Sequence, residues 1–273
     1  MKNLITLSVM LVAGLMATAQ ATKPEKVSID TLPNYELRTI ENTAFDVGEK
    51  LTYRIHYGFV DAGEAVLEVK PSKWKFSGRE AYHVVGTGRS LGAFDWVFKV
   101  RDRYETYIDK EGIFPYRFIR DVSEGGYEIF QDYQFHPDKR ALKTHEKEEF
   151  ATPEFIQDLV SSFYYARTLD FTNVKKGDLF EITTFVDGEV FPLRIKFVGK
   201  ETIKLRNGKY RCMKFVPVIQ EGRIWKSEED LQIWITDDAN KIPILVRSEI
   251  LFGSIKMEVV DYENLKNPIA LVK

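Results

Sequence analysis

Apolar and polar residues alternate along most of this chain from Phe45 onward, and this pattern constrains the fold more than any other feature. One stretch places polar residues between apolar ones: Leu51, Tyr53, Ile55 and Tyr57 are separated by Thr52, Arg54 and His56. A period of two puts successive side chains on opposite faces of a β-strand. The pattern therefore predicts a mainly β fold whose strands bury one face. It also predicts a solvated position for His56, on the polar face.

Short polar segments separate the predicted strands and indicate antiparallel hairpins. Asp187-Gly188 divides the runs 180–186 and 189–198, and this dipeptide tolerates the positive φ angles of a two-residue turn. Residues 61–64 (Asp-Ala-Gly-Glu) predict another turn. Residues 237–240 (Asp-Asp-Ala-Asn) predict a tight turn held by side chains, because they lack the spaced carboxylates, central Gly and closing Glu of a calcium loop.

One segment departs from the β pattern and predicts a helix. Four apolar residues recur at i, i+3, i+4 and i+7, on one helical face: Ile156, Leu159, Val160 and Phe163. Thr152 is the predicted N-cap, and Pro153 suits the first helical position, where its missing N–H is not needed. We expect a helix over residues 153–169 that packs this apolar face onto a sheet.

The segments before and after this helix carry turn residues at similar spacings. Four pairs of matching positions lie 128 to 130 residues apart: Gly48 and Gly177, Gly78 and Gly208, Asp109 and Asp237, and Gly125 and Gly253. Each turn needs its Gly or Asp at a fixed place, so the spacing predicts an internal duplication. Its two related halves, residues 44–150 and 176–263, would each form a meander of five or six antiparallel strands.

Two such meanders must bury their apolar faces against another layer. A curved sheet or partly open barrel meets this requirement, since the one amphipathic helix between the halves can cover its concave face. A sandwich of two sheets is the alternative. Barrels of this strand number can leave a ligand cavity. We therefore predict a single β-rich domain over residues 44–263, followed by a tail over residues 264–273.

The first residues have the order of a secretion signal. Lys2 precedes an apolar run over residues 4–17, and small residues at 17, 19 and 21 form small-x-small cleavage sites. The run is shorter than the roughly 20 apolar residues that span a bilayer. We expect a signal peptide over residues 1–21 and a polar leader, flexible or loosely docked, over residues 22–43. The expected location is the periplasm, with the outer surface or the medium as alternatives, and no transmembrane segment is expected after signal removal.

Composition argues against several classes of function. With 39 basic and 41 acidic residues the net charge is −2, which gives no reason to expect binding to nucleic acid or to an anionic membrane surface. Cys212 is the single cysteine, so it cannot form an internal disulfide, and its place in a predicted strand indicates burial. The four histidines show no metal-ligand spacing, and no catalytic motif occurs. We expect no catalytic residue, no metal site and no cofactor.

Several motifs resemble those of domain of unknown function family 3108. They are Asp158, Ser161, Tyr164 and Arg167 in the predicted helix, Gly208 with Cys212 and Pro217, and Trp234-Ile235-Thr236-Asp237-Asp238 leading to Ile242-Pro243. The resemblance runs from about residue 45 to residue 262. It implies an exported, β-rich protein of the bacterial envelope without an assigned activity. In outline such proteins are similar to the periplasmic lipoprotein carriers, whose half-open barrels hold acyl chains under a helix.

The candidate ligand-binding residues are polar and aromatic: Tyr164, Arg167, Phe163, Trp96 and Trp225. Arg167 either joins an internal network, with Asp158 or with an Asp or Glu of a strand, or holds an anionic headgroup together with Tyr164. Trp96 and Trp225 are expected to begin corresponding strands of the two halves. The favoured function is non-enzymatic binding of an apolar or amphipathic ligand, such as a lipid, in the cavity of the curved sheet. A module that binds a glycan or an envelope protein is the alternative, and an unrecognised hydrolase is the second alternative.

Overall fold

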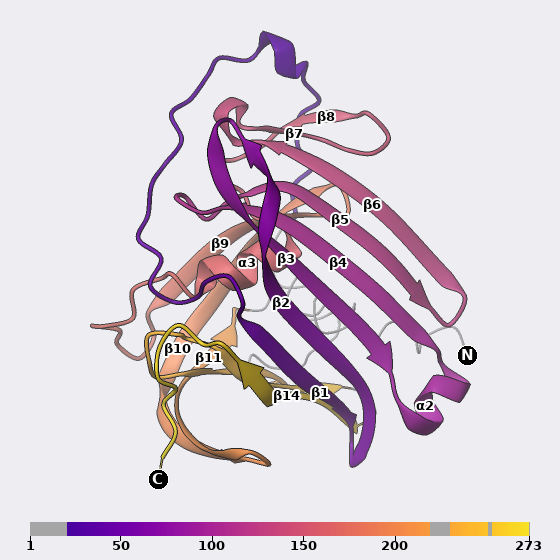
Figure 1. The fold of residues 1–273 in the computed structure, drawn as a ribbon, viewed down its shortest axis with the longest axis vertical. Coiled ribbons are helices and arrows are strands. Elements are labelled where there is room, and N and C mark those ends of the chain that lie inside the picture. The colour runs from indigo at the N-terminus through magenta and orange to yellow at the C-terminus, as the bar shows by residue number, and fades with distance from the viewer. Residues whose placement is uncertain (1–20, 219–229, 251–252, 273) are drawn as a thin grey trace.

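The computed structural model describes residues 21–218, 230–250 and 253–272, which form one large antiparallel sheet with short helices (Figure 1). The strands are β1 (Lys50–Tyr57), β2 (Val60–Phe76), β3 (Arg79–Ser90), β4 (Val100–Asp109), β5 (Pro115–Glu124), β6 (Tyr127–His136), β7 (Ala141–Lys143), β8 (Glu149–Ala151), β9 (Leu179–Val186), β10 (Glu189–Leu205), β11 (Gly208–Pro217), β12 (Leu231–Thr236), β13 (Pro243–Ile250) and β14 (Gly253–Glu263). The helices are η1 (Ile29–Thr31), α2 (Gly92–Val97), η2 (Pro137–Lys139) and α3 (Leu159–Ala166). Within the described residues, none of the helices is long and apolar enough to cross a membrane.

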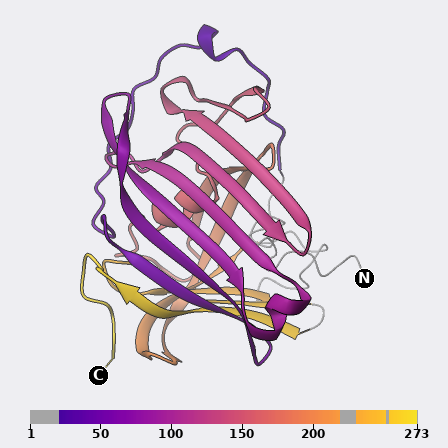
Figure 2. The same cartoon turned by 45° about the vertical axis from the view of Figure 1, so that its right-hand side comes forward.

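The 14 strands form two meanders that meet where β1 pairs with β14. The order across the sheet is β8-β7-β6-β5-β4-β3-β2-β1-β14-β13-β12-β11-β10-β9, so β8 and β9 are edges and the sheet is not closed into a barrel. Figures 1 and 2 show a strongly curved sheet with α3 inside the curve. The predicted mainly β fold, an open curved sheet with one helix between its halves, is confirmed.

The two meanders have strands of matching length at their starts. β1 and β9 each have eight residues, and β2 and β10 each have 17. These equal lengths concern the strand pattern alone, and the internal duplication stays a prediction.

The leader is more firmly docked than the sequence suggested. The backbone N–H of Val27 donates to Glu149 and that of Ala151 donates to Glu25, so the leader continues the sheet beyond β8. Thr22 exchanges two backbone hydrogen bonds with Val190 of β10. A three-residue edge strand leaves backbone groups unpaired, and the leader pairs them. The leader is therefore docked at these points, and how loosely the rest of it is held stays a prediction.

The helix is shorter than predicted and begins later. Asp158 is its N-cap: the carboxylate accepts from the backbone N–H groups of Val160 and Ser161, and the Ser161 hydroxyl accepts from the N–H of Asp158. Such a capping box is a strong start signal. Residues 153–157 are not helical, because the backbone of Gln157 pairs with β9 as a parallel bridge. The predicted start at Pro153 with Thr152 as N-cap was wrong, and α3 also ends earlier than residue 169.

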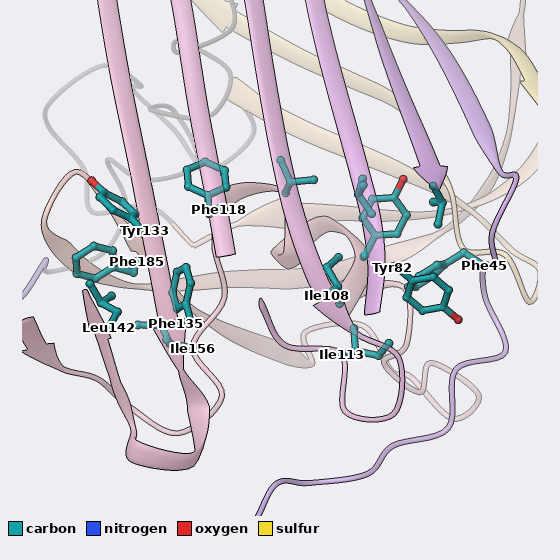
Figure 3. Packing of buried hydrophobic residues seen from close by; sticks show 14 of the residues in the cluster. Phe45, Tyr82, Ile108, Ile113, Phe118, Tyr133, Phe135, Leu142, Ile156 and Phe185 are labelled. Atoms are coloured by element: carbon teal, nitrogen blue, oxygen red, sulfur yellow. The ribbon is translucent and has the colours of Figure 1, made fainter. Parts of the chain in front are cut away.

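The main apolar core lies between α3 and the concave face of the sheet. Its buried residues come from the strands, the segment that enters β1 and the helix, and Figure 3 shows many of them, including Phe118, Tyr133 and Phe185. The ring centroids of Tyr133 and Phe185 lie 5.3 Å apart, so β6 and β9 meet here through side chains although they are distant in the sheet. Phe163 of α3 packs against this core and against a second core that includes Tyr53. Burial of these apolar side chains holds the curve closed over the helix.

Two of the predicted turns are confirmed and one was wrong. Asp187 and Gly188 have φ angles of 49° and 83° and connect β9 to β10. In the 237–240 turn, the carboxylate of Asp238 accepts from the backbone N–H groups of Asn240 and Lys241, as expected of a turn held by side chains. Residues 61–64, by contrast, lie inside β2. The chain turns earlier, at Gly58 and Phe59, where Gly58 takes a positive φ of 57°.

The N-cap of α3 generates a prediction about pH. Complete burial raises the pKa of the Asp158 carboxyl from 3.8 to about 6, although Thr106 and the helix N–H groups oppose the shift. The folded state therefore binds a proton that the unfolded state releases between about pH 4 and 6, and acidification through this window stabilises the fold. The free energy of unfolding of the native protein minus that of Asp158→Asn should be about 2 kcal/mol larger at pH 4.5 than at pH 7.5. Urea unfolding of both proteins at the two pH values measures this difference, and a constant or falling difference contradicts it.

Candidate functional site

Arg167 lies at the carboxyl end of α3 and takes part in an internal network. Its Nη1 and Nη2 donate to the two carboxylate oxygens of Glu49 at 2.6 and 2.7 Å, and its Nε donates to the carbonyl of Asn240 at 2.8 Å. Nη2 also donates to the carbonyl of Ala44 at 3.2 Å. Burial disfavours the charged guanidinium, yet the hydrogen bonds and charge of Glu49 raise the pKa of Arg167. Each guanidinium nitrogen thus has a protein acceptor, which agrees with the alternative that Arg167 joins an internal network.

The predicted partner of Arg167 differs in identity. Asp158 does not contact Arg167, because its carboxylate caps α3 and accepts from Thr106. Tyr164 and Phe163 do lie beside the guanidinium, with ring centroids 5.3 and 5.8 Å from its carbon. Tyr164 is fully buried, and burial raises the pKa of its hydroxyl well above the usual value. The three helix residues are therefore together, on the protein's interior side, and a ligand role for them stays a prediction.

The two predicted tryptophans are not part of this group. Trp96 lies on α2, not at the start of a strand, and its side chain is 93% exposed. Trp225 lies outside the described residues. The structure thus brings Tyr164, Arg167 and Phe163 together on α3. Trp96 lies on a different helix, α2, at the end of the strands.

The sequence reasoning missed a polar cluster on the concave face of β4 and β5. Arg120, Asp102 and Glu124 are 2%, 4% and 1% exposed, and Tyr104 lies directly opposite Arg120 in the register. Arg120 and Glu124 share the face of the core residue Phe118, because all three occupy alternate positions of β5. A charged residue in the apolar phase of a strand is the signal that could have identified the cluster.

The turn between β9 and β10 contributes to this cluster. The carboxylate of Asp187 accepts from Arg120 Nη1 at 3.0 Å and from Gln131 Nε2 at 2.8 Å. Nε of Arg120 is buried and has no hydrogen-bond partner within the described part of the chain. Burial raises the pKa of the Tyr104 hydroxyl to about 12, against the charge and the hydrogen bond of Arg120, so the phenol stays protonated at neutral pH. The cluster therefore places a neutral hydroxyl next to a guanidinium.

The neighbouring part of β3 presents almost no side chains on this face. Gly86 lies opposite Tyr104 and Gly88 lies opposite Asp102, and across the next pairing Ala65 of β2 lies opposite Gly88. A methyl group at Gly86 would lie 3.1 Å from a side-chain carbon of Leu67. These small residues leave little side-chain volume on the concave face of β3, which is separated from Arg120 on β5 by β4.

His56 is buried, against the prediction of a solvated position. Its Nδ1 lies 2.9 Å from a carboxylate oxygen of Asp61, and its Nε2 lies 3.1 Å from one of Glu258. The tip of the β10–β11 hairpin closes over the group, since Arg206 contacts both carboxylates. Because each ring nitrogen already has a carboxylate, neither is placed to activate a nucleophile. In the parts of the chain described above, no group of three or more His, Cys, Asp and Glu side chains is placed to hold a metal ion.

A surface hollow of about 460 Å³ lies on the opposite, convex face of β2 to β5. Charged side chains dominate its lining: Glu64, Arg89, Arg101, Arg103 and Asp121. Arg89 pairs with Glu64, and Arg101 pairs with Asp95. Such a lining suits solvent or polar groups, and it does not suit an apolar ligand.

Cys212 is buried, as predicted, and its environment generates a prediction about reactivity. Its side chain is inaccessible, and burial raises the pKa of the thiol to about 12. The thiolate is the reactive species, so the native protein should not react with an aromatic disulfide reagent at pH 8 on the timescale of minutes. The same protein in denaturant should release one equivalent of chromophore. Rapid reaction of the native protein would contradict this assignment.

The Arg167–Glu49 pair generates a prediction about stability. Glu49→Gln leaves a buried guanidinium without its counter-charge and should lower the free energy of unfolding by about 3–5 kcal/mol. Arg167→Lys keeps the charge but loses the two-point geometry, so it should destabilise the protein less while any bound ligand is retained. The double variant Glu49→Gln/Arg167→Met should recover part of the loss. Urea unfolding of these proteins and of Arg167→Met measures the effects, and additive losses of the two single variants in the double variant would refute a direct pair.

Comparison with known proteins agrees with this fold. The family described as "Protein of unknown function (DUF3108)" matches residues 52–260. A β-barrel-like protein of the domain of unknown function DUF1849 from Brucella abortus is 11% identical, with a TM-score of 0.51, and the match covers 81% of this chain and 99% of that one. This likeness concerns the fold alone.

Two further solved structures match with lower scores. One is described as an exported protein with a YmcC-like fold, from Bacteroides fragilis (11% identity, 83% of this chain and 100% of that one, TM-score 0.29). The other is described as a lipoprotein from Parabacteroides distasonis (9% identity, 84% and 100%, TM-score 0.28). No curated protein matches. Because the family match covers well over half of the sequence, the chain belongs to the DUF3108 family of proteins of unknown function.

Proposed function

We propose that this protein is exported to the periplasm and binds an amphipathic ligand, such as a lipid, against the concave face of its sheet, without catalysing a reaction. The observation that carries the proposal is Arg120. It is 2% exposed, lies in the apolar phase of β5, and has a buried Nε without an acceptor among the described residues. Nε of Arg54, Arg79 and Arg140 is likewise without a hydrogen-bond acceptor in the described part of the chain, so what distinguishes Arg120 is its place: a buried guanidinium on the apolar face of β5 fits a ligand oxygen.

The apolar part of the ligand has a suitable surface next to Arg120. Phe118 and Tyr133 belong to the core that lines the concave face, and Gly86 and Gly88 leave this face low on the neighbouring strand. Because Phe118 and Tyr133 are already buried, the gain comes from the ligand's own apolar surface, at about 25 cal/mol for each Å² removed from water. This surface supports a ligand that is mostly hydrocarbon.

The polar part of the ligand is constrained by charge. Asp187 pairs with Arg120, and Asp102 and Glu124 act on the neighbouring Tyr104, so the acidic surroundings disfavour a multiply charged anion. A neutral or zwitterionic group with an oxygen acceptor meets Nε of Arg120 and the Tyr104 hydroxyl at lower cost. We therefore assign headgroup recognition to Arg120 and Tyr104 rather than to Arg167, whose donors all have protein acceptors.

Export is supported by the amino-terminal sequence. The charged start, the apolar run over residues 4–17 and the small-x-small sites have the order of a cleavable signal. A glycan- or protein-binding module and a hydrolase assembled from distant residues are the competing functions. The hydrolase has no feature among the described residues that favours it, since both ring nitrogens of His56 are held by carboxylates.

Native mass spectrometry of protein purified from the bacterial envelope without detergent tests the proposal. The native protein should carry a reproducible added mass that is lost on solvent extraction and identified as a lipid. Arg120→Gln should retain this mass in a much smaller fraction of molecules, by about tenfold if one charge-assisted hydrogen bond is lost. Arg117→Gln is the matched control, because Arg117 lies on the same strand, on the other face, and pairs with Asp132.

Either of two outcomes would contradict the proposal. A clean unliganded mass from several native preparations would remove the ligand and make the glycan- or protein-binding alternative the first to test, on glycan and envelope-protein arrays. Equal retention by Arg120→Gln and Arg117→Gln would remove the role of Arg120. Urea unfolding of both variants must accompany the measurement, so that a loss of ligand is not a loss of fold.

A further inference from the structure

Three connections at one end of the sheet expose large apolar side chains. Phe59 in the β1–β2 turn is fully exposed, and Trp96 and Val97 on α2 are 93% and 77% exposed. Val60 and Tyr127, next to the β1–β2 and β5–β6 turns, are each about half exposed. We call these five residues the apolar rim. Exposed aromatic side chains of this size are uncommon on a protein surface unless they contact something.

The rim is one continuous region of the molecule. The rings of Tyr57 and Phe94 lie 6.1 Å apart, which joins the β1–β2 turn to α2, and α2 also packs against β2. The backbone N–H of Gly125 donates to the carbonyl of Lys99 at 2.9 Å, which joins the β5–β6 turn to the residues that follow α2. Figures 1 and 2 both show α2 beside the β1–β2 turn, at the end of the strands.

Helix α2 exposes apolar side chains that an ordinary surface helix would bury. None of its residues is buried. Its one acidic residue, Asp95, accepts from Ser90 at 2.6 Å and from Arg101 at 2.6 Å, so the polar side chain is engaged by the protein. Trp96 and Val97 point to solvent. Surface helices normally place their apolar face on the core, so this arrangement is built for contact with an apolar environment.

We propose that the apolar rim inserts into the surface of a phospholipid bilayer. The rim side chains come from three separate connections and have charged residues near them in sequence, such as Asp61, Lys99 and Glu128. A protein partner would instead need a continuous packed patch with a desolvated centre. Trp and Tyr favour the membrane–water boundary, where an apolar ring and a polar tip are both accommodated.

The position of the rim fits the ligand site but does not depend on it. Glu124 immediately precedes the β5–β6 turn, so the Arg120 cluster lies at the same end of β5 as the rim. A ligand entering the concave face from this end would come directly from the bilayer surface. Membrane docking itself requires only the rim.

Co-sedimentation with vesicles of phosphatidylethanolamine and phosphatidylglycerol tests the proposal. The full chain is expressed, and the form recovered from the envelope is used for every variant, so any contribution of its amino terminus is shared. Phe59→Ser/Trp96→Ser should partition into vesicles about tenfold more weakly than the native protein, because binding scales with the apolar area inserted. Trp74→Ser is the matched control, because Trp74 is half exposed on the β2–β3 hairpin at the opposite end of the strands. It should bind like the native protein.

A second readout locates the insertion. Lipids brominated near the headgroup should quench the fluorescence of the native protein and of Trp74→Ser, and should quench Trp96→Ser less. Arg120→Gln should still bind vesicles, which separates failure of the ligand site from failure of the rim. No vesicle binding by the native protein, or equal binding by Phe59→Ser/Trp96→Ser, would overturn the proposal. Rim-dependent self-association in sedimentation velocity without vesicle binding would also overturn it and would assign the rim to a second copy of the chain.

Discussion

The buried ion pair between Arg167 and Glu49 holds together parts of the fold that are distant in the sequence. Arg167 ends the helix, Glu49 precedes β1, Ala44 belongs to the segment entering the sheet, and Asn240 lies in the turn after β12. One guanidinium thus joins α3 to both meanders near the place where β1 pairs with β14. An open sheet has no closing strand pair to fix its curvature, so this contact and the core around α3 must do so. A buried pair adds little net stability against an apolar alternative, but it accepts only one arrangement of its partners.

The edges of the sheet follow from the same openness. An unclosed sheet leaves β8 and β9 with backbone groups that could pair with another chain. The leader covers β8 through Glu25 and Val27, and the segment entering α3 covers β9 through Gln157. Both covering segments are irregular, because each also serves a second purpose: the leader continues toward Ala44, and Gln157 directly precedes the cap of α3. The curved sheet is therefore protected without being a barrel.

Local features of the fold could be predicted from sequence, and features set by distant partners could not. The Asp187-Gly188 hairpin and the Asp238 turn depend on residues within a few positions, and both were predicted correctly. The start of the helix was wrong because the backbone of Gln157 pairs with β9, more than 20 residues further along the chain. The burial of His56 was missed because Glu258 reaches it from β14, 202 residues away. Periodicity assigns a face to each side chain, but it does not tell which face another element covers.

The two buried arginines of the concave side show why the site was harder to predict than the fold. Both lie in apolar surroundings and both contact a carboxylate, so sequence gives no reason to prefer one. Arg167 has protein acceptors for Nε, Nη1 and Nη2, and its position is explained by the fold alone. Arg120 pairs through Nη1 with Asp187 but has no described acceptor for its buried Nε. The place of Arg120, on the apolar face of β5 and at the end of the sheet that carries the apolar rim, agrees with the proposed ligand site.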